Sequence, residues 1–320
     1  MPTKTNLHVV WLKRDLRLQD NEAIFNALAT KEPVLLLYVF EQLLISDPHY
    51  SQRHWDFIKQ SILDLNEQLQ PYNSKILAVD SNIIATINQL LNHYSIKNVY
   101  SHQETGILVT FNRDIAFKRF CKNNLIHWHE HINNGVQRGL KDRSQWMALC
   151  NTYFELDPLP FSPKKNQLLS ISEIEILEKN FRLPTLKTNF NTPFQKGGRS
   201  TGLKYLNSFF NERYVNYMFH ISKPELARKS CSRISPYLAW GNISIREVYR
   251  RAYLLKKTVK HKKALEAFMS RLRWQSHFIQ KFEMEHTMEE ASINKGFHKL
   301  KKNVSKKYQL AWKQGQTGFP

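Results

Sequence analysis

The most informative stretch of the sequence is Ser230-Cys231-Ser232-Arg233-Ile234-Ser235-Pro236-Tyr237-Leu238-Ala239-Trp240-Gly241-Asn242-Ile243-Ser244. Its first half gathers hydroxyl side chains around one guanidinium, and Pro236 suits the first turn of a helix, where a missing N–H costs nothing. Ser232 or Ser235 can cap that helix, which leaves backbone N–H groups free for an anion. Two interpretations follow: a phosphate cradle in which Arg233 adds charge-assisted hydrogen bonds, or an ordinary capped helix. These residues alone favour the ordinary capped helix.

The composition is that of a basic, globular chain long enough for two domains. It has 320 residues, 42% of them hydrophobic, with 19 Phe, 13 Tyr and 7 Trp, which argues against disorder. Lysine and arginine number 47 against 27 aspartate and glutamate, a formal net charge of +20. Such a charge favours a polyanionic partner, because each neutralised phosphate releases condensed counterions. We therefore expect nucleic acid as the partner, the alternative being a generally basic protein without one.

The sequence contains no pattern typical of secretion, membrane insertion or cysteine chemistry. Residues 1–6 lack the charged-then-apolar pattern of a signal peptide, and no apolar run approaches membrane-spanning length. Cys121, Cys150 and Cys231 form neither a disulfide framework nor a metal motif. We expect a cytoplasmic protein in a reducing setting, without membrane contact and without a metal site.

The N-terminal half alternates short apolar runs with amphipathic segments such as the one that contains Trp55, Ile58 and Ile62. Strands that alternate with helices predict a parallel, doubly wound sheet. No Gly-x-Gly-x-x-Gly follows the first strand and no Gly-x-x-x-x-Gly-Lys-Ser/Thr is present, which argues against a dehydrogenase or a P-loop enzyme. The expected strands are 7–12, 33–40, 75–79, 97–101 and 126–132, and the expected helices begin near residue 22 and cover 51–70, 82–93 and 110–123.

The alternation of strands and helices stops near the middle of the chain. Prolines and polar residues fill 157–196, where apolar spacing over 171–177 predicts at most one short helix, so this segment is typical of an interdomain crossing. From Arg199 onward, apolar residues at helical spacing predict helices that include 245–255 and 265–282. The expected fold class is an α/β doubly wound domain followed by an all-α domain.

Several motifs together resemble the photolyase/cryptochrome family. Trp11-Leu12-Lys13-Arg14-Asp15-Leu16-Arg17-Leu18-Gln19-Asp20-Asn21 closely matches the opening signature of the family, and Arg113-Asp114 and the run from Gly135 to Trp146 match a bacterial branch of it. The stretch quoted first matches the family's flavin-phosphate loop, which reverses the preference for an ordinary capped helix. The resemblance implies an α/β antenna domain at 1–133, an interdomain linker at 134–198 and the N-terminal part of a helical FAD-binding domain at 199–320.

The same resemblance assigns individual residues to FAD and to DNA. Trp274 matches an aromatic residue that packs on damaged bases, the alternative being a core aromatic on a helix. Two positions depart from the family: Arg271 stands where dimer-repair enzymes carry glutamate, and Gln275 replaces an arginine. Because arginine accepts no hydrogen bonds, these changes affect dimer repair more than flavin binding. The implied cofactor contacts are Tyr217, Cys231, Ser232, Arg233, Ser235, Phe268, Arg271 and Phe278, and the implied DNA contacts are Trp274 and Gln275.

A second, light-harvesting chromophore is also implied, at the carboxyl ends of the strands of the N-terminal domain. Folate-binding members of the family carry an acidic residue where this chain has Thr110, so the identity of the chromophore stays open. His127, His129 and His131 alternate along the last expected strand and would face one side. A metal site there is the alternative to a half-exposed strand, which we prefer because no cysteine or further histidine lies nearby in sequence.

The end of the sequence falls inside another family motif. Residues 312–320 match Trp-x-x-Gly-x-Thr-Gly-Tyr/Phe-Pro, which in relatives continues into Asp-Ala-x-Met-Arg and further helices. We therefore expect a truncated chain that leaves the apolar face of 265–282 exposed and binds flavin weakly or not at all.

The resemblance implies a deoxyribodipyrimidine photo-lyase activity for the complete protein. Blue light excites reduced FAD, which donates an electron to a pyrimidine lesion flipped out of DNA. The alternatives are a cryptochrome-type photoreceptor without repair activity, which Arg271 favours, and a non-catalytic nucleic-acid-binding remnant. We expect a monomer in each case.

Overall fold

The computed structural model describes residues 4–188, 193–300 and 305–318. The chain divides into two compact units, Met1–Met284 and Glu285–Pro320. The first unit holds the sheet and helices α1 to α13. The second holds α14 (Lys306–Gln314) after two short 3-10 turns.

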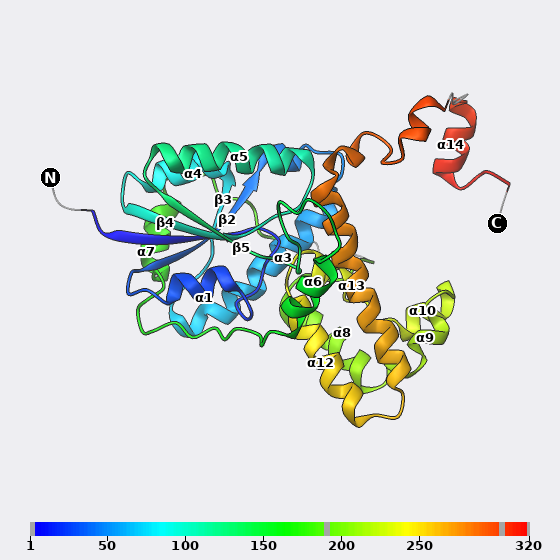
Figure 1. Cartoon of the computed structure of the whole chain (residues 1–320). Coiled ribbons are helices and arrows are strands. Elements are labelled where there is room, and N and C mark those ends of the chain that lie inside the picture. The colour runs from blue at the N-terminus through cyan, green and yellow to red at the C-terminus, as the bar shows by residue number, and fades with distance from the viewer. Residues whose placement is uncertain (1–3, 189–192, 301–304, 319–320) are drawn as a thin grey trace. The chain divides into compact units, whose positions relative to one another are not determined.

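The sheet is parallel throughout, with strand order β3-β2-β1-β4-β5 (Figure 1). The reversal of strand order on the two sides of β1 makes the sheet doubly wound, which confirms the predicted fold class. Apolar runs form its central strands because both faces are covered. The strands are β1 (Asn6–Leu12), β2 (Val34–Glu41), β3 (Leu77–Ser81), β4 (Ser95–His102) and β5 (His127–His131).

Helices follow the strands and then replace them, as the sequence predicts. In the first half these are α1 (Glu22–Leu28), α2 (Gln42–Ile45), α3 (Gln52–Leu69), α4 (Ile83–Leu90), α5 (Leu108–Asn123), α6 (Trp146–Glu155) and α7 (Ile171–Glu178). The later helices are α8 (Arg199–Asn211), α9 (Tyr217–His220), α10 (Pro224–Ser230), α11 (Ser235–Ala239), α12 (Ile245–Thr258) and α13 (Lys262–Met284). The single short helix predicted within 157–196 is confirmed by α7.

Alternate residues of each strand point into two separate cores. Val9 and Trp11 face a core that is completed by α4, α5 and α7, whereas Val10 and Leu12 face a second core. This second core continues through α1 and α3 into the later helices, including α8, α11, α12 and α13. Figure 1 shows α4 and α5 on one face of the sheet and α1 and α3 on the other. One continuous core therefore joins the sheet to the helices that follow it.

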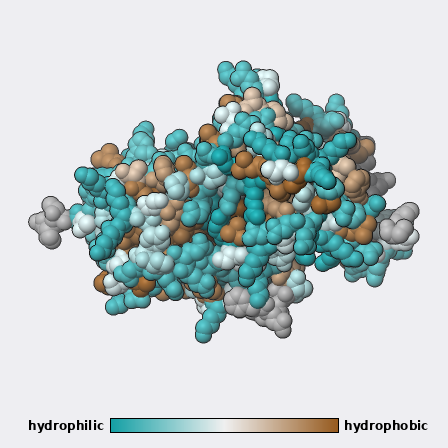
Figure 2. Space-filling model, turned by 90° about the horizontal axis from the view of Figure 1, so that it is seen from below, coloured by the Kyte–Doolittle hydropathy of each residue, from teal (hydrophilic) through white to brown (hydrophobic). Residues whose placement is uncertain are grey.

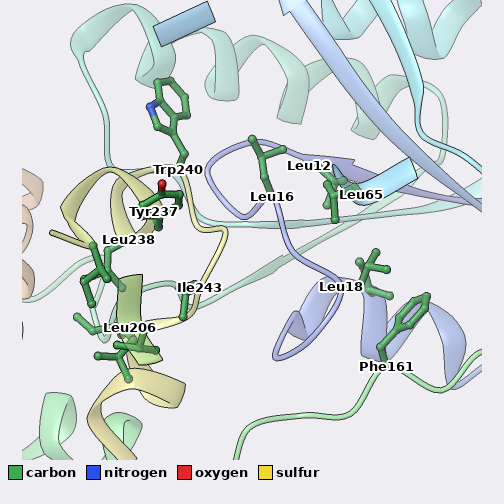
Figure 3. Close-up of a cluster of buried hydrophobic side chains, with 14 of the residues drawn as sticks. Leu12, Leu16, Leu18, Leu65, Phe161, Leu206, Tyr237, Leu238, Trp240 and Ile243 are labelled. Atoms are coloured by element: carbon green, nitrogen blue, oxygen red, sulfur yellow. The ribbon is translucent and has the colours of Figure 1, made fainter. Parts of the chain in front are cut away.

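The two most specific motifs of the sequence pack against each other. The Leu16 N–H donates to the Trp240 carbonyl at 3.1 Å, and Asn242 Nδ2 donates to the Leu16 carbonyl at 3.1 Å. Figure 3 shows the buried side chains at this junction, with Leu12, Leu16 and Leu18 on one side and residues of 237–243 on the other. We call the contact between residues 13–21 and 240–246 the junction. It fixes α11 and α12 against the end of β1.

Two expectations about the helical half are wrong. The apolar face of 265–282 is not exposed, because Leu265, Phe268 and Leu272 are buried in the second core. Only the side of α13 that carries Trp274 and Phe278 is open. The N-terminus of α11 also lacks a serine cap: Ile234 is the cap residue, without a side-chain hydrogen bond, and Ser235 is the first helical residue.

The surface seen in Figure 2 is mostly hydrophilic, with hydrophobic residues scattered over it. This agrees with the high proportion of lysine and arginine in the sequence. Among the described residues, no helix combines the length and the apolar character needed to cross a membrane.

Candidate functional site

A cavity of about 540 Å³ lies between the carboxyl edge of the sheet and helices α11 and α13. Residues just after β1, β4 and β5 form one wall, which is where open parallel sheets place their ligand sites. Side chains of α13, with Ser235 and Ala239 of α11, form the other wall. The sheet-edge wall consists of Arg14, Gln103, Glu104, Thr105, Asn133, Asn134 and Val136.

Hydrogen bonds hold the two walls together. The Gln137 N–H donates to Gln280 Oε1 at 2.7 Å, and Gln280 Nε2 donates back to the Gln137 carbonyl at 2.9 Å. Thr105 Oγ1 donates to Glu283 Oε2 at 2.6 Å. The C-terminal half of α13 is therefore fixed against the loops that follow β4 and β5.

The open side of α13 carries a row of one arginine and two aromatic rings. The Arg271 guanidinium lies 4.6 Å from the centre of the Trp274 ring, within the range of a cation–π contact. Trp274 meets Phe278 edge-to-face at 5.9 Å, and the two side chains are 51% and 56% exposed. Arg271 has no ion pair among the described residues, so its charge is available to a ligand.

The loop before α11 is shaped by contacts to its backbone. Nη2 of Arg213 donates to the Ser232 carbonyl at 3.4 Å, and Nη1 of the same side chain donates to the Cys231 carbonyl. Arg233 adopts a left-handed conformation with φ +59°, and its carbonyl accepts a hydrogen bond from Gln195 Nε2 at 2.8 Å. These contacts turn the chain so that Ser235 reaches the cavity.

The cavity brings together five of the residues assigned from the sequence: Ser235, Arg271, Trp274, Gln275 and Phe278. Cys231, Ser232 and Arg233 lie on the same loop but do not line the cavity. The remaining two assigned residues, Tyr217 and Phe268, are buried and meet edge-to-face at 5.6 Å. Burial raises the pKa of Tyr217 to about 12, so this phenol stays protonated at neutral pH.

A buried charge cluster beneath the sheet-edge wall was not assigned from the sequence. Nη2 of Arg113 lies 2.7 Å from Glu104 Oε2 and Nη1 lies 2.9 Å from Glu41 Oε2, while Arg14 Nε lies 3.2 Å from Glu104 Oε1. Burial alone would raise the pKa of Glu104, but the positive charges of Arg113 and Arg14 outweigh it and lower that pKa to about 2. Glu104 is therefore an anion that is already neutralised by its own neighbours. Glu104 and Arg113 are nine residues apart in the sequence, and this spacing does not predict the contact between them.

Thr110 occupies the position at which folate-binding relatives are expected to carry an acid. It is buried, and its Oγ1 donates to the Ile107 carbonyl at 2.8 Å. The hydroxyl thus completes the first turn of α5 and provides no carboxylate at this place.

The three histidines of β5 share one face, as predicted. The rings of His127 and His129 stack at 4.1 Å, and the His129 ring stacks on Tyr100 at 4.5 Å. Nε2 of His129 lies 2.9 Å from Asn98 Oδ1. Within the described residues no group of three or more histidine, cysteine or acidic side chains could hold a metal ion. The face is a stacked ladder of rings.

This ladder predicts a loss of stability in mild acid. Burial, together with the neighbouring His127 and His131, lowers the pKa of His129 from 6.5 to about 4. The unfolded chain therefore binds a proton at this residue below pH 6.5 while the folded chain does not, so stability falls from pH 6.5 to pH 4. Urea unfolding across this range should show a shallower pH dependence for His129→Gln than for the unchanged chain. His93→Gln, at an exposed position before β4, is the control, and equal slopes for all three proteins would contradict the prediction.

Comparisons with known proteins agree with this fold. The family model of DNA photolyase matches residues 8–136, and the model of the FAD binding domain of DNA photolyase matches residues 268–320. The deoxyribodipyrimidine photo-lyase of Alkalihalophilus pseudofirmus is 21% identical over 345 residues, covering 100% of this chain and 68% of that protein. Cryptochrome-2 of Gallus gallus is 22% identical over 337 residues, covering 98% of this chain and 57% of that protein.

The fold is also that of solved structures. The archaeal photolyase from Sulfolobus tokodaii, solved with two FAD molecules, matches with a TM-score of 0.74 at 20% identity, covering 98% of this chain and 68% of that one. The chain therefore spans between 57% and 68% of the length of these three proteins. Two models of one family match residues 8–136 and 268–320, and the two most specific motifs of the chain meet at the junction. On this evidence the chain belongs to the photolyase/cryptochrome family.

Proposed function

We propose that this protein holds FAD in the cavity between the sheet edge and α13 and uses blue light to transfer an electron to a pyrimidine lesion in DNA. The observation that carries the proposal is that one cavity gathers Ser235 with Arg271, Trp274 and Phe278. These side chains come from two separate segments that the family resemblance assigns to the same reaction. The family matches at residues 8–136 and 268–320 support it.

The lining fits the chemistry of a flavin dinucleotide. A diphosphate needs cationic and hydroxyl donors, and the guanidinium of Arg271 and the Ser235 hydroxyl provide them. Flavin and nucleobase rings need flat apolar faces, and Trp274 and Phe278 provide these. A volume of about 540 Å³ also lies within the usual range of cofactor sites, about 300–1,000 Å³.

When bound, reduced FAD supplies the electron that blue light makes available for transfer. The side chains of this protein then have positioning roles. We assign Arg271 to the anionic part of the cofactor and Phe278 to its ring, with Trp274 and Gln275 on the flipped base. The aromatic faces of Trp274 and Phe278 would also exclude water from the space between FAD, the electron donor, and the lesion, the electron acceptor. The assignment of Tyr217, Cys231, Ser232, Arg233 and Phe268 to the cofactor stays a prediction.

One observation favours the alternative of a photoreceptor without repair activity. Arg271 replaces the carboxylate expected of dimer-repair enzymes, and its guanidinium lies on the same Trp274 ring that we assign to the base. A guanidinium only donates hydrogen bonds, so it cannot accept one from a thymine N–H. A lesion-containing oligonucleotide irradiated in the presence of FAD and a reductant separates the two functions, because only repair restores the intact bases.

Other properties of the protein are proposed from the same evidence. We propose domains at 1–133 and 199–320 with a linker between them, a monomeric state and a cytoplasmic location. A second chromophore at the carboxyl ends of the strands is proposed by analogy with the archaeal photolyase, which was solved with two FAD molecules.

A flavin titration tests the proposal. FAD fluorescence should be quenched on addition of the protein, with Arg271→Gln weakening the affinity about tenfold, as expected when a charge-assisted hydrogen bond is lost. Arg182→Gln removes the same charge from an exposed ion pair with Asp80 and should leave the affinity unchanged. A titration method is needed because the sequence predicts weak binding. Absence of saturation, or equal affinities for both variants, would contradict the proposed site.

A further inference from the structure

A second groove, of about 360 Å³, lies where α13 begins. Its lining shares no residue with the cavity described above. Figure 1 shows α9 beside this end of α13, and α10 packs on α9. The floor of the groove includes Met218 and Phe219 of α9, and its rim is formed by Lys260, His261, Lys262 and Lys263.

The floor presents a flat ring to solvent because α9 is anchored through its other residues. Tyr217 is buried against Phe209 and Phe268, each at 5.6 Å, and Nδ1 of His220 lies 2.6 Å from Ser230 Oγ. With Tyr217 facing inward, Phe219 remains 63% exposed. A well-anchored aromatic ring of this kind loses little freedom when it stacks on a ligand.

The rim is a row of lysine cations. Lys260, Lys262 and Lys263 are exposed and form no ion pair among the described residues. The acidic residue that follows them on α13, Glu266, is already paired with Lys256 at 3.2 Å. The Lys262 N–H donates to the Lys260 carbonyl at 3.0 Å, a tight turn that keeps the three lysines together. The groove therefore favours an anionic ligand.

We propose that this groove binds a single-stranded segment of nucleic acid, with phosphates on the three lysines and a base stacked on Phe219. A row of cations beside an exposed aromatic ring is the combination that single-strand-binding proteins use, since every base has a π face. The net charge of +20 supports a polyanion rather than an apolar partner. An acidic peptide could satisfy the lysines, but it would leave the ring of Phe219 without a stacking partner.

The geometry of α13 connects the groove to the first cavity. Lys263 and Trp274 are separated by 11 residues, which on an α-helix is about three turns plus 20° and a rise of about 16 Å. Both side chains therefore lie on the same side of the helix. The positions between them on that side are the partly exposed Ala267 and the exposed Ser270 and Arg271. This leaves an open path for a strand.

A rise of about 16 Å corresponds to about five nucleotides of a B-form strand. A strand whose base reached Trp274 would thus place phosphates on the lysines of the groove. This part of the inference rests on the proposed function, in which Trp274 contacts DNA. The affinity of the groove itself for a single strand does not depend on the proposed function.

Fluorescence anisotropy with labelled oligothymidylate, without flavin or lesions, tests the groove. The variant Lys260→Gln/Lys262→Gln/Lys263→Gln should bind a 15-mer at least about tenfold more weakly at low salt. Its slope of log affinity against log salt should also decrease by about 2, because three phosphate contacts are lost. The variant Lys164→Gln/Lys165→Gln/Lys187→Gln removes the same charge from exposed positions elsewhere and should change affinity less than twofold.

Two further measurements separate the parts of the proposal. Phe219→Ala should weaken binding about fivefold without changing the salt slope, since it removes stacking and no charge. Trp274→Ala should weaken the binding of the 15-mer but not of a 5-mer. If the affinity for the 15-mer is unchanged, only the proposed DNA contact at Trp274 is contradicted, and the groove proposal is not. Equal losses in the two lysine variants would overturn the groove proposal, as would lysine-dependent binding of poly-glutamate in place of oligothymidylate.

Discussion

Replacing Gly241 by alanine is expected to lower the free energy of unfolding by about 3 kcal/mol. Gly241 has φ +69°, a conformation that costs an L-residue about 1–2 kcal/mol. An added Cβ would also lie 2.3 Å from the Arg14 carbonyl oxygen and 2.6 Å from the Asp15 Cα. These are backbone atoms that cannot rotate away, and overpacking of this kind costs about 1–3 kcal/mol.

The effect of this substitution should reach the cavity that we propose as the flavin site. Gly241 lies at the junction, where its carbonyl accepts a hydrogen bond from Arg17 Nη1 at 3.1 Å, and Arg14 lines the cavity. Gly139→Ala is the matched control, because Gly139 has φ +74° but an added Cβ would meet no atom within 4 Å beyond the adjacent residues. Urea unfolding should show a loss of only about 1 kcal/mol for the control. Similar losses in both variants would contradict the close packing of the junction.

Replacing Arg246 by methionine is expected to cost about 3–5 kcal/mol, because it leaves a buried carboxylate without its counter-charge. Asp20 is fully buried, and its carboxylate accepts hydrogen bonds from Ser244 Oγ, from Arg246 Nη2 and, at 3.1 Å, from Arg246 Nε. Methionine keeps the apolar stem of the side chain beside Tyr153. The variant therefore isolates the loss of charge.

Two matched variants test this explanation. Arg250→Met removes a neighbouring arginine of α12 that pairs with the exposed Asp157, and it should cost less than about 1 kcal/mol. Asp20→Asn combined with Arg246→Met removes both charges, and asparagine tolerates the left-handed conformation of residue 20, φ +52°. The double variant should be more stable than Arg246→Met alone in urea unfolding. A double variant that is less stable than the single one would show that the cost does not come from the unpaired charge.

The sheet could be predicted from the sequence because its signals are local. Each strand is a short apolar run and each covering helix has its own amphipathic spacing, so element type and order follow without knowledge of contacts. The helix α6 is not among the helices predicted from the sequence, and it begins at the end of the Gly135–Trp146 motif. Its buried residues Trp146, Cys150 and Phe154 are spaced by four, a helical signal that was present in the sequence.

The site could be predicted only in part, because its walls are joined over long distances in sequence. The motifs supplied Ser235, Arg271 and Trp274, whereas the contact of Glu104 with Arg113 and the hydrogen bonds between Gln137 and Gln280 depend on the assembled fold. The burial of the apolar face of α13 was missed for the same reason. Its core partners include α8, α9 and α12, all of which are present in this chain.

Hydrogen–deuterium exchange of the full chain with and without FAD tests the central claim, that one cavity between the sheet edge and α13 is the flavin site. We expect slower exchange on FAD addition in peptides that cover 232–239, 268–279 and 103–105, which contribute to the loop and to both walls. Peptides from α4 and α7, on the far face of the sheet, should be unchanged. Protection confined to regions outside the cavity, or no protection at FAD concentrations that quench its fluorescence, would contradict it.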